Sequence, residues 1–233
     1  MKTLVITGAS SGIGLETAKV FQNEDYSIVN LSRKKIPLDG STHLETDLSD
    51  NKALENNLNK VVNLVKDSDQ ICLVHNASNM VSDNVGEIDA DQMRRVFEVN
   101  LVAPAVLNRA LLPFMKAGSS IIYIGSTLSE KAVPHMASYV TSKHAMVGLM
   151  RSTCQDLFGK FVHTVCVCPG ATRTEMLLEY VGGDESALKL MAETLSEQRL
   201  IEPVEIARTI LFCAQNSVVN GSVIHANLGI LET

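Results

Sequence analysis

The chain has 233 residues, of which 45% are apolar and 20% charged, a composition typical of a globular protein with one well-buried core. Acidic residues outnumber basic ones by 26 to 20, and the net charge of -6 argues against a nucleic-acid partner. No apolar run is long enough to predict a membrane span, and Thr7-Gly8 interrupts the apolar N-terminus too early for a signal peptide. We therefore expect a cytoplasmic protein with a single domain over residues 1–233.

The cysteines and histidines lack the spacing of metal ligands. There are 5 cysteines and 6 histidines, and no C-x-x-C pair occurs. Cys166 and Cys168 would share one face of a strand, but no second ligand pair lies near them in the sequence. We expect buried free thiols, with neither a metal site nor a disulfide framework.

Strand-like and helix-like segments alternate along the first third of the chain. Short runs of apolar and β-branched residues predict strands, and apolar residues three and four positions apart predict helices. The expected elements, in order, are strand Thr3–Thr7, helix Ile13–Phe21, strands Ser27–Leu31 and Thr42–Thr46, helix Asn51–Val65 and strand Ile71–Val74.

A long helical region comes next. Asp89 with Gln92 three residues later resembles a capping box, and the helical pattern extends toward Met115. Pro104 predicts a bend, or the boundary between two successive helices. Beyond this region we expect strand Ser120–Ile124, helix Ala137–Phe158, strand Val162–Val167, a helical stretch over Thr174–Leu200, helix Val204–Ala214 and strand Ser222–His225.

Alternating strands and helices predict an α/β protein. Each strand–helix–strand unit places its two strands parallel, with the helix against one face of the sheet. The chain should therefore form a doubly wound parallel sheet between two helical layers, a three-layer Rossmann fold.

A glycine-rich turn links the first strand to the first helix. It reads Thr7-Gly8-Ala9-Ser10-Ser11-Gly12-Ile13-Gly14. Glycines let the backbone approach a pyrophosphate closely, and amide hydrogens at the helix start donate to its oxygens. A helix can also begin this way for structural reasons alone, but the position after the first strand favours dinucleotide binding.

The end of the second strand indicates which dinucleotide binds. Many dinucleotide folds that prefer NAD have a carboxylate here, facing the ribose hydroxyls. This chain has Ser32 followed by Arg33, Lys34 and Lys35. Positive charge would attract the 2′-phosphate of NADP(H), which we expect as the cofactor in preference to NAD(H). The alternative is a solvated basic turn without a ligand.

Tyr139 and Lys143 are spaced for proton transfer. They lie four residues apart in a predicted helix, so their side chains project from one face, and Ser126 precedes them at the end of a strand. A free phenol has a pKa of about 10, and a neighbouring ammonium is expected to lower it toward neutrality. A Tyr and a Lys at this spacing can also be an ordinary surface pair.

These motifs together resemble the short-chain dehydrogenase/reductase family over nearly the whole chain. Each motif alone is common, but five of them in the family's order are specific. They are the turn residues Thr7, Gly8, Gly12 and Gly14; Asp47; Asn76-Ala77-Ser78; the tetrad Asn100, Ser126, Tyr139 and Lys143; and Pro169, Gly170 and Thr174.

The resemblance implies a role for each tetrad residue. Tyr139 would protonate the carbonyl oxygen in reduction, or act as base in oxidation, and Ser126 would orient the substrate. Lys143 would bind the nicotinamide ribose, and Asn100 would hold a water of a proton relay. Further cofactor contacts are expected from the turn residues Ser10, Ser11 and Ile13, and from Ser32, Arg33, Asp47, Leu48, Asn76, Ala77, Pro169, Gly170, Thr172 and Thr174.

The sequence departs from the family pattern at two places. Ser78 stands where the family has a glycine, and Asn227-Leu228 stands where it often has Asp-Gly. The C-terminal end commonly packs against a second subunit in this family, so a homodimer or homotetramer is implied.

The resemblance leaves the substrate open. Specificity is expected from the loop between Ser126 and Tyr139 and from the segment after Thr174, in which Gly182-Gly183 could be the hinge of a lid. The expected activity is that of a carbonyl reductase or alcohol dehydrogenase acting on a small molecule. The alternatives are a 3-oxoacyl-carrier-protein reductase and a non-catalytic NADP(H)-binding regulator.

Overall fold

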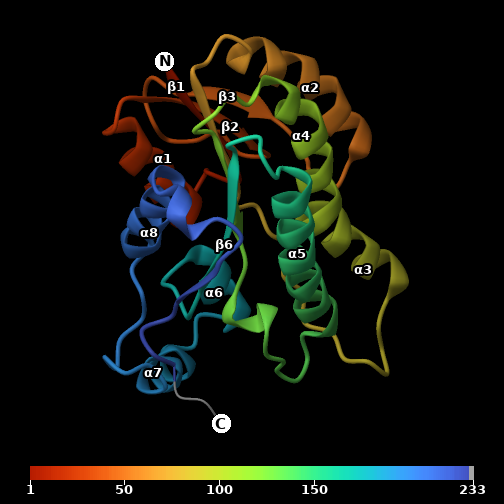
Figure 1. Ribbon diagram of the computed structural model, residues 1–233. Coiled ribbons are helices and arrows are strands. Elements are labelled where there is room, and N and C mark those ends of the chain that lie inside the picture. Colours follow the sequence, from red (N-terminus) through yellow and green to blue (C-terminus); the bar gives the residue numbers. More distant parts are fainter. Residues whose placement is uncertain (231–233) are drawn as a thin grey trace.

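The sheet consists of seven parallel strands in the order β3-β2-β1-β4-β5-β6-β7 (Figure 1), in a computed structural model that describes residues 1–230. The strand order reverses between β1 and β4, so the loops that follow these two strands diverge and leave room for a ligand. The strands are β1 Lys2–Thr7, β2 Tyr26–Ser32, β3 Thr42–Glu45, β4 Gln70–His75, β5 Ser120–Ile124, β6 His163–Pro169 and β7 Val223–Ala226.

Helices cover both faces of the sheet. Helices α1 and α8 pack on one face, and α2, α4 and α5 on the other, while α6 and α7 lie beyond the carboxyl edge (Figure 1). The predicted doubly wound α/β fold is thus confirmed. The helices are α1 Gly12–Gln22, α2 Asn51–Val65, α3 Ala90–Phe97, α4 Ala103–Leu111, α5 Ala137–Asp156, α6 Glu175–Tyr180, α7 Glu185–Glu193 and α8 Pro203–Gln215.

The central strands are buried on both faces, which explains their continuous apolar sequences. In β6, Val165 and Val167 face the helices α1 and α8, whereas Cys166 and Cys168 face α5. All five cysteines are free, as expected, and only Cys154 is not fully buried.

The long central helix is interrupted where the sequence predicted a bend. Asp89 caps α3 by accepting hydrogen bonds from two backbone amides, and a π-helical turn over Glu98–Val102 joins α3 to α4. Pro104 has no N–H for the carbonyl of Asn100, and the wider turn accommodates the missing bond. The break therefore lies before the proline and contains Asn100.

The helical run that contains α3 and α4 bears on the prediction that no apolar segment is long enough to span a membrane. Residues Ala90–Phe114 are long and apolar enough to cross a membrane by length and composition, with a mean hydropathy of 1.2. The core helix of a globular domain meets the same criterion. Here the run packs against α2 and α5, and an 18-residue window of it is 39% buried inside the protein.

The predicted helical stretch Thr174–Leu200 is only partly helical. It forms the two short helices α6 and α7, separated by Gly182 and Gly183 with φ values of +62° and +76°. Few residues other than glycine adopt this left-handed conformation, so the pair ends one helix and redirects the chain. Residues 194–200, the last of the predicted stretch, are not helical.

Candidate active site

The glycine-rich turn has no room for a side chain at Gly8 or Gly14. Gly8 and Gly12 have φ values of +71° and +53°. A Cβ atom on Gly8 would lie 2.9 Å from Cα of Ala77, and one on Gly14 would lie 2.4 Å from the carbonyl oxygen of Gly8. The turn therefore exposes backbone amides at the start of α1, an arrangement suited to phosphate oxygens.

Neighbouring strands fix the conformation of this turn. Asn76 Nδ2 donates to the carbonyl oxygens of Thr7 and Gly8, each at 3.0 Å. The Thr7 hydroxyl accepts from the backbone amides of Asn76 and Ala77. Asn30, buried in β2, accepts the Ala9 amide at 3.0 Å. The sequence predicted that Asn76 contacts the cofactor, but no local pattern pointed to Asn30.

Ser32 and Arg33 occupy different environments at the end of β2. The Ser32 hydroxyl accepts from Asn30 and donates to the carbonyl of Lys34, so it is already engaged. Arg33 is exposed and lies near Asp47. Hydrogen bonds from Ser49, together with the Arg33 charge, lower the pKa of Asp47. An exposed guanidinium therefore borders the end of the site where an adenosine would lie.

Ser126, Tyr139 and Lys143 come together at the carboxyl edge of the sheet. Ser126 follows β5 and hydrogen-bonds Tyr139 from α5. Lys143, one helical turn further along α5, places its Nζ 5.5 Å from the centre of the Tyr139 ring. The predicted proximity of these three residues is present, and both Tyr139 and Lys143 are buried.

The pKa of Tyr139 does not follow the sequence prediction. Burial raises it to about 12, while hydrogen bonds with Ser126 and Ser78 act in the opposite direction. Lys143 donates to the carbonyl oxygen of Ile124 at 2.7 Å, and burial lowers its own pKa to about 8. The expectation that the Lys143 ammonium lowers the pKa of Tyr139 is thus wrong for this arrangement: burial has the largest effect on this pKa, and the causes that lower it are the hydrogen bonds with Ser126 and Ser78 rather than the charge of Lys143.

The side chain of Asn100 is fully hydrogen-bonded. Its Oδ1 accepts from the Asn79 amide at 2.7 Å and from Ser78 Oγ at 3.3 Å. Its Nδ2 donates to the Asn79 carbonyl at 3.0 Å and to Ser142 Oγ at 2.9 Å. Asn100 therefore ties the loop after β4 to α5, and its amide group has no remaining hydrogen bond to offer a water.

Asp83 is a positioning residue that the sequence did not reveal. Its carboxylate accepts hydrogen bonds from the backbone amide and the hydroxyl of Ser138, in the first turn of α5. A carboxylate at this end of a helix satisfies free amides and complements the helix dipole. Asp83 thereby positions the helix that carries Tyr139, and a partner 55 residues away leaves no local sequence signal.

The segment after β6 approaches the glycine turn from the other side. A Cβ atom on Gly170 would lie 3.0 Å from Cα of Asn227, and one on Gly12 would lie 3.2 Å from Cγ2 of Thr174. Thr172 donates to the Gly170 carbonyl at 3.0 Å. Thr174 also caps α6 by accepting the Leu177 amide. The motif that contains Gly170 and Thr174 therefore lies beside the glycine-rich turn.

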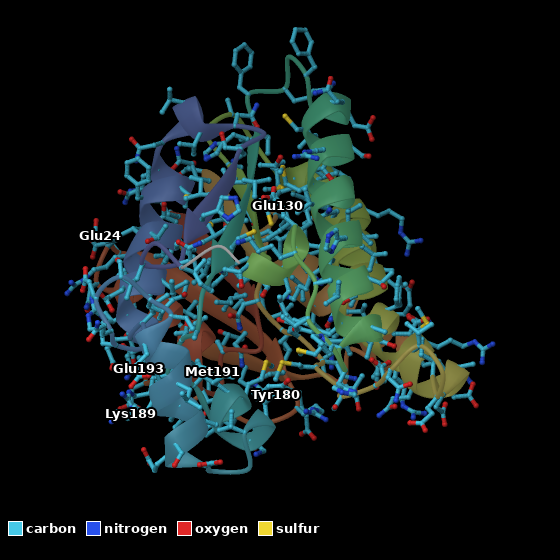
Figure 2. The ribbon with its side chains drawn as sticks, turned by 90° about the horizontal axis from the view of Figure 1, so that it is seen from below. Glu24, Glu130, Tyr180, Lys189, Met191 and Glu193 are labelled. Atoms are coloured by element: carbon cyan, nitrogen blue, oxygen red, sulfur yellow. The ribbon has the colours of Figure 1, made fainter. Side chains whose placement is uncertain are left out.

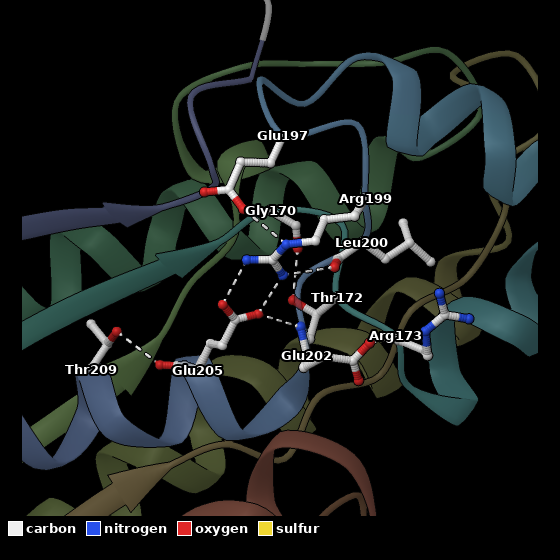
Figure 3. A network of polar contacts seen from close by, with 9 residues as sticks. All are labelled: Gly170, Thr172, Arg173, Glu197, Arg199, Leu200, Glu202, Glu205 and Thr209. Carbon is white, nitrogen blue, oxygen red and sulfur yellow. Dashed lines mark hydrogen bonds and ion pairs between the residues drawn. The ribbon is translucent and has the colours of Figure 1, made fainter.

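Helices α6 and α7 belong to a segment that leaves the sheet after Thr172 and returns at Ile201, and contacts join its two ends. Thr172 pairs with Ile201 as a short parallel bridge. The guanidinium of Arg199 donates hydrogen bonds to both carboxylate oxygens of Glu205 in α8, at 2.7 and 2.8 Å (Figure 3). In Figure 2, Lys189 of α7 lies at the rim of the molecule, whereas Tyr180 of α6 lies nearer the middle. The two ends of this segment are therefore held together at the carboxyl edge of the sheet.

The glycine-rich turn lies where the strand order reverses, at the same edge of the sheet as Ser126 and the buried Tyr139 and Lys143. This arrangement defines a dinucleotide-dependent oxidoreductase. The family model described as short chain dehydrogenase matches residues 2–183. The chain belongs to this family, as the motifs predicted.

Known relatives are distant but extend over the whole chain. Protein FixR of Bradyrhizobium diazoefficiens is 29% identical, covering 98% of this chain and 86% of its own length. NADPH-dependent aldehyde reductase 1 of Arabidopsis thaliana is 28% identical, with coverage of 98% and 85%. The solved structure of a 4-hydroxyisoleucine dehydrogenase complexed with NADH has a TM-score of 0.85 at 26% identity, with coverage of 97% and 98%. Structural neighbours thus hold NADH, and another was solved with NADP bound.

Proposed function

We propose that the protein is an NADP(H)-dependent oxidoreductase that reduces a carbonyl group or oxidises the corresponding alcohol. The observation that carries this proposal is the hydrogen-bonded pair Ser126 and Tyr139, with buried Lys143 beside it, at the same sheet edge as the glycine turn. A buried phenol that keeps its proton at neutral pH is a suitable donor to a carbonyl oxygen.

The residues at this edge fit a dinucleotide. A Cβ atom would lie under 3.0 Å from neighbouring atoms at Gly8 and Gly14 and at 3.0 Å at Gly170, so these positions require or favour glycine and bring the backbone segments close together. When bound, the cofactor supplies the hydride. The residues proposed to hold it are Gly8, Ser10, Ser11, Gly12, Ile13, Gly14, Ser32, Arg33, Asp47, Leu48, Asn76, Ala77, Tyr139, Lys143, Pro169, Gly170, Thr172 and Thr174.

Each tetrad residue has a distinct part in the proposed reaction. Ser126 donates to the substrate oxygen and orients it, and Tyr139 transfers its hydroxyl proton to that oxygen during reduction. Lys143 donates to the nicotinamide ribose. Asn100 binds the water of the proton relay through its backbone carbonyl, because its side-chain amide makes all of its hydrogen bonds within the protein.

The function is tested by following NADPH consumption with a panel of aldehydes, small ketones, diketones and a 3-oxoacyl thioester. Turnover of a free carbonyl substrate would support the proposal. Preference for the thioester on a carrier protein would favour the 3-oxoacyl reductase alternative. Binding of NADPH without turnover of any member would contradict an enzymatic role and favour the regulator.

The exposed charge of Arg33 supports the preference for NADP(H). We expect Arg33→Ser to lower kcat/KM with NADPH about 10- to 150-fold while leaving kcat/KM with NADH nearly unchanged, because a charge-assisted hydrogen bond to phosphate contributes about 1.5–3 kcal/mol. Lys160→Ser, at an exposed loop following α5, is the matched control. An unchanged NADPH:NADH ratio in Arg33→Ser would contradict this assignment.

We also propose assembly into a homodimer or homotetramer through the face formed by α4 and α5. A groove of about 560 Å³ runs between these helices, and most of the residues along it are apolar. Its lining consists of Leu101, Val102, Ala105, Val106, Arg109, Ala145 and Leu149. Burial of this surface against a second copy would remove it from water.

A further inference from the structure

Ser78 stands at the centre of the candidate site, at a position where the family motif has glycine. It follows Asn76 and Ala77 at the carboxyl end of β4. Its backbone lies outside the left-handed region, so the local conformation accepts a side chain without strain. The half-buried side chain lies between Tyr139 of α5 and Asn100 of the π-helical turn.

The Ser78 hydroxyl has two polar neighbours. It donates to Asn100 Oδ1 at 3.3 Å and is also within hydrogen-bonding reach of the Tyr139 side chain. The distance to Asn100 is well above the usual 2.7–2.8 Å or so of an O–H···O bond, so this bond is weak. The same Oδ1 accepts a much shorter bond of 2.7 Å from the Asn79 amide. Asn100 would therefore stay satisfied if Ser78 turned away.

The geometry allows the hydroxyl to serve two states of Tyr139. A serine hydroxyl has one proton and two lone pairs. While Tyr139 keeps its proton, Ser78 can accept from it and donate to Asn100. Once Tyr139 has given up its proton, Ser78 can rotate about χ1 and donate to the phenolate oxygen. Asn100 cannot make this contact itself, since Asn79 and Ser142 hold both of its amide hydrogens.

We propose that Ser78 is a positioning residue of the proton-transfer site, whose hydroxyl donates to the Tyr139 oxygen when Tyr139 is deprotonated. The inference rests on the proposed function and adds a residue that acts through Tyr139. It complements Ser126, which hydrogen-bonds the same oxygen from the side of β5. No bond of Ser78 is made or broken: only its hydrogen bond changes partner.

Removal of the hydroxyl should disfavour the phenolate. In alcohol oxidation Tyr139 acts as the base, so loss of a hydrogen bond to its charged form raises its pKa and moves the rising limb of the pH–kcat profile to higher pH. We expect Ser78→Ala to shift this limb by about one pH unit and to lower kcat for oxidation about 10-fold on that limb. The KM for NADP should stay within a factor of two or so. Ser78→Thr, which keeps a hydroxyl, should restore the wild-type profile.

Two further measurements separate this role from a structural one. Ser142→Ala removes the other side-chain partner of Asn100 and a hydrogen bond of 2.7 Å to the backbone carbonyl of Tyr139, but no contact with the Tyr139 phenol oxygen, so it should leave the pH limb in place. In protein labelled with ¹³C at tyrosine Cζ, the Tyr139 signal is identified by its loss in Tyr139→Phe. Ser78→Ala should shift this signal in the free protein, because a hydrogen bond to its oxygen is lost.

The outcomes are distinct. An unshifted limb and an unchanged Tyr139 signal in Ser78→Ala would overturn the proposal, as would an equal limb shift in Ser142→Ala. If the wild-type protein turns over no carbonyl or alcohol, the proposed function fails. The carbon signal would still decide whether Ser78 contacts Tyr139 as inferred.

Discussion

Tyr139→Phe is expected to lower kcat for carbonyl reduction by about 10²–10⁴-fold, the usual contribution of a positioned general acid. Phenylalanine keeps the ring and loses only the hydroxyl that Ser126 and Ser78 hydrogen-bond. The remaining ring should hold α5 in place, so NADPH affinity and the melting temperature should change little. NADPH absorbance gives turnover, and NADPH fluorescence gives binding.

A matched substitution separates chemistry from packing. Tyr26 is also buried, but it lies at the start of β2, at the opposite edge of the sheet, where its ring packs against Phe21. Tyr26→Phe should retain wild-type turnover. If Tyr139→Phe retained it as well, Tyr139 would not be the proton donor and the proposed mechanism would be wrong.

The sequence predicted the architecture well because its signals were local. The strands β1, β2 and β5 are buried along most of their length, and their parallel pairing follows from the intervening helices. The turn at Gly8 and Gly12 was equally visible, since its left-handed backbone requires glycine. Ser126, Tyr139 and Lys143 were found because each follows a strand or shares a helix face with its partner.

The contacts that position these residues were beyond the reach of the sequence. Asp83 caps α5 from 55 residues away, and Asn30 holds the Ala9 amide from a separate strand. Their placement depends on the packed fold rather than on spacing. The pKa of Tyr139 was wrongly predicted for the same reason: helical spacing showed that Lys143 was near, but not that burial would dominate.

Gly14→Ala is expected to weaken NADPH binding by at least about 100-fold and to lower the free energy of unfolding by about 1–3 kcal/mol, the usual cost of overpacking. The added Cβ would lie 2.4 Å from the Gly8 carbonyl oxygen and 2.5 Å from Asn76 Nδ2. Either the turn must open or Asn76 must release it. Both changes would displace the amides that face the phosphates. Fluorescence titration with NADPH and thermal unfolding measure the two effects.

Gly148→Ala provides the opposite case within the same fold. Gly148 lies in α5, and an added Cβ would meet no atom within 4 Å. Alanine is favoured over glycine in a helix by about 1 kcal/mol, so this variant should be slightly more stable and should bind NADPH normally. Because neither glycine has a positive φ, the two substitutions differ in crowding rather than in backbone strain. Equal NADPH affinity in both variants would mean that the close approach of Gly8, Gly14 and Asn76 does not shape the cofactor site.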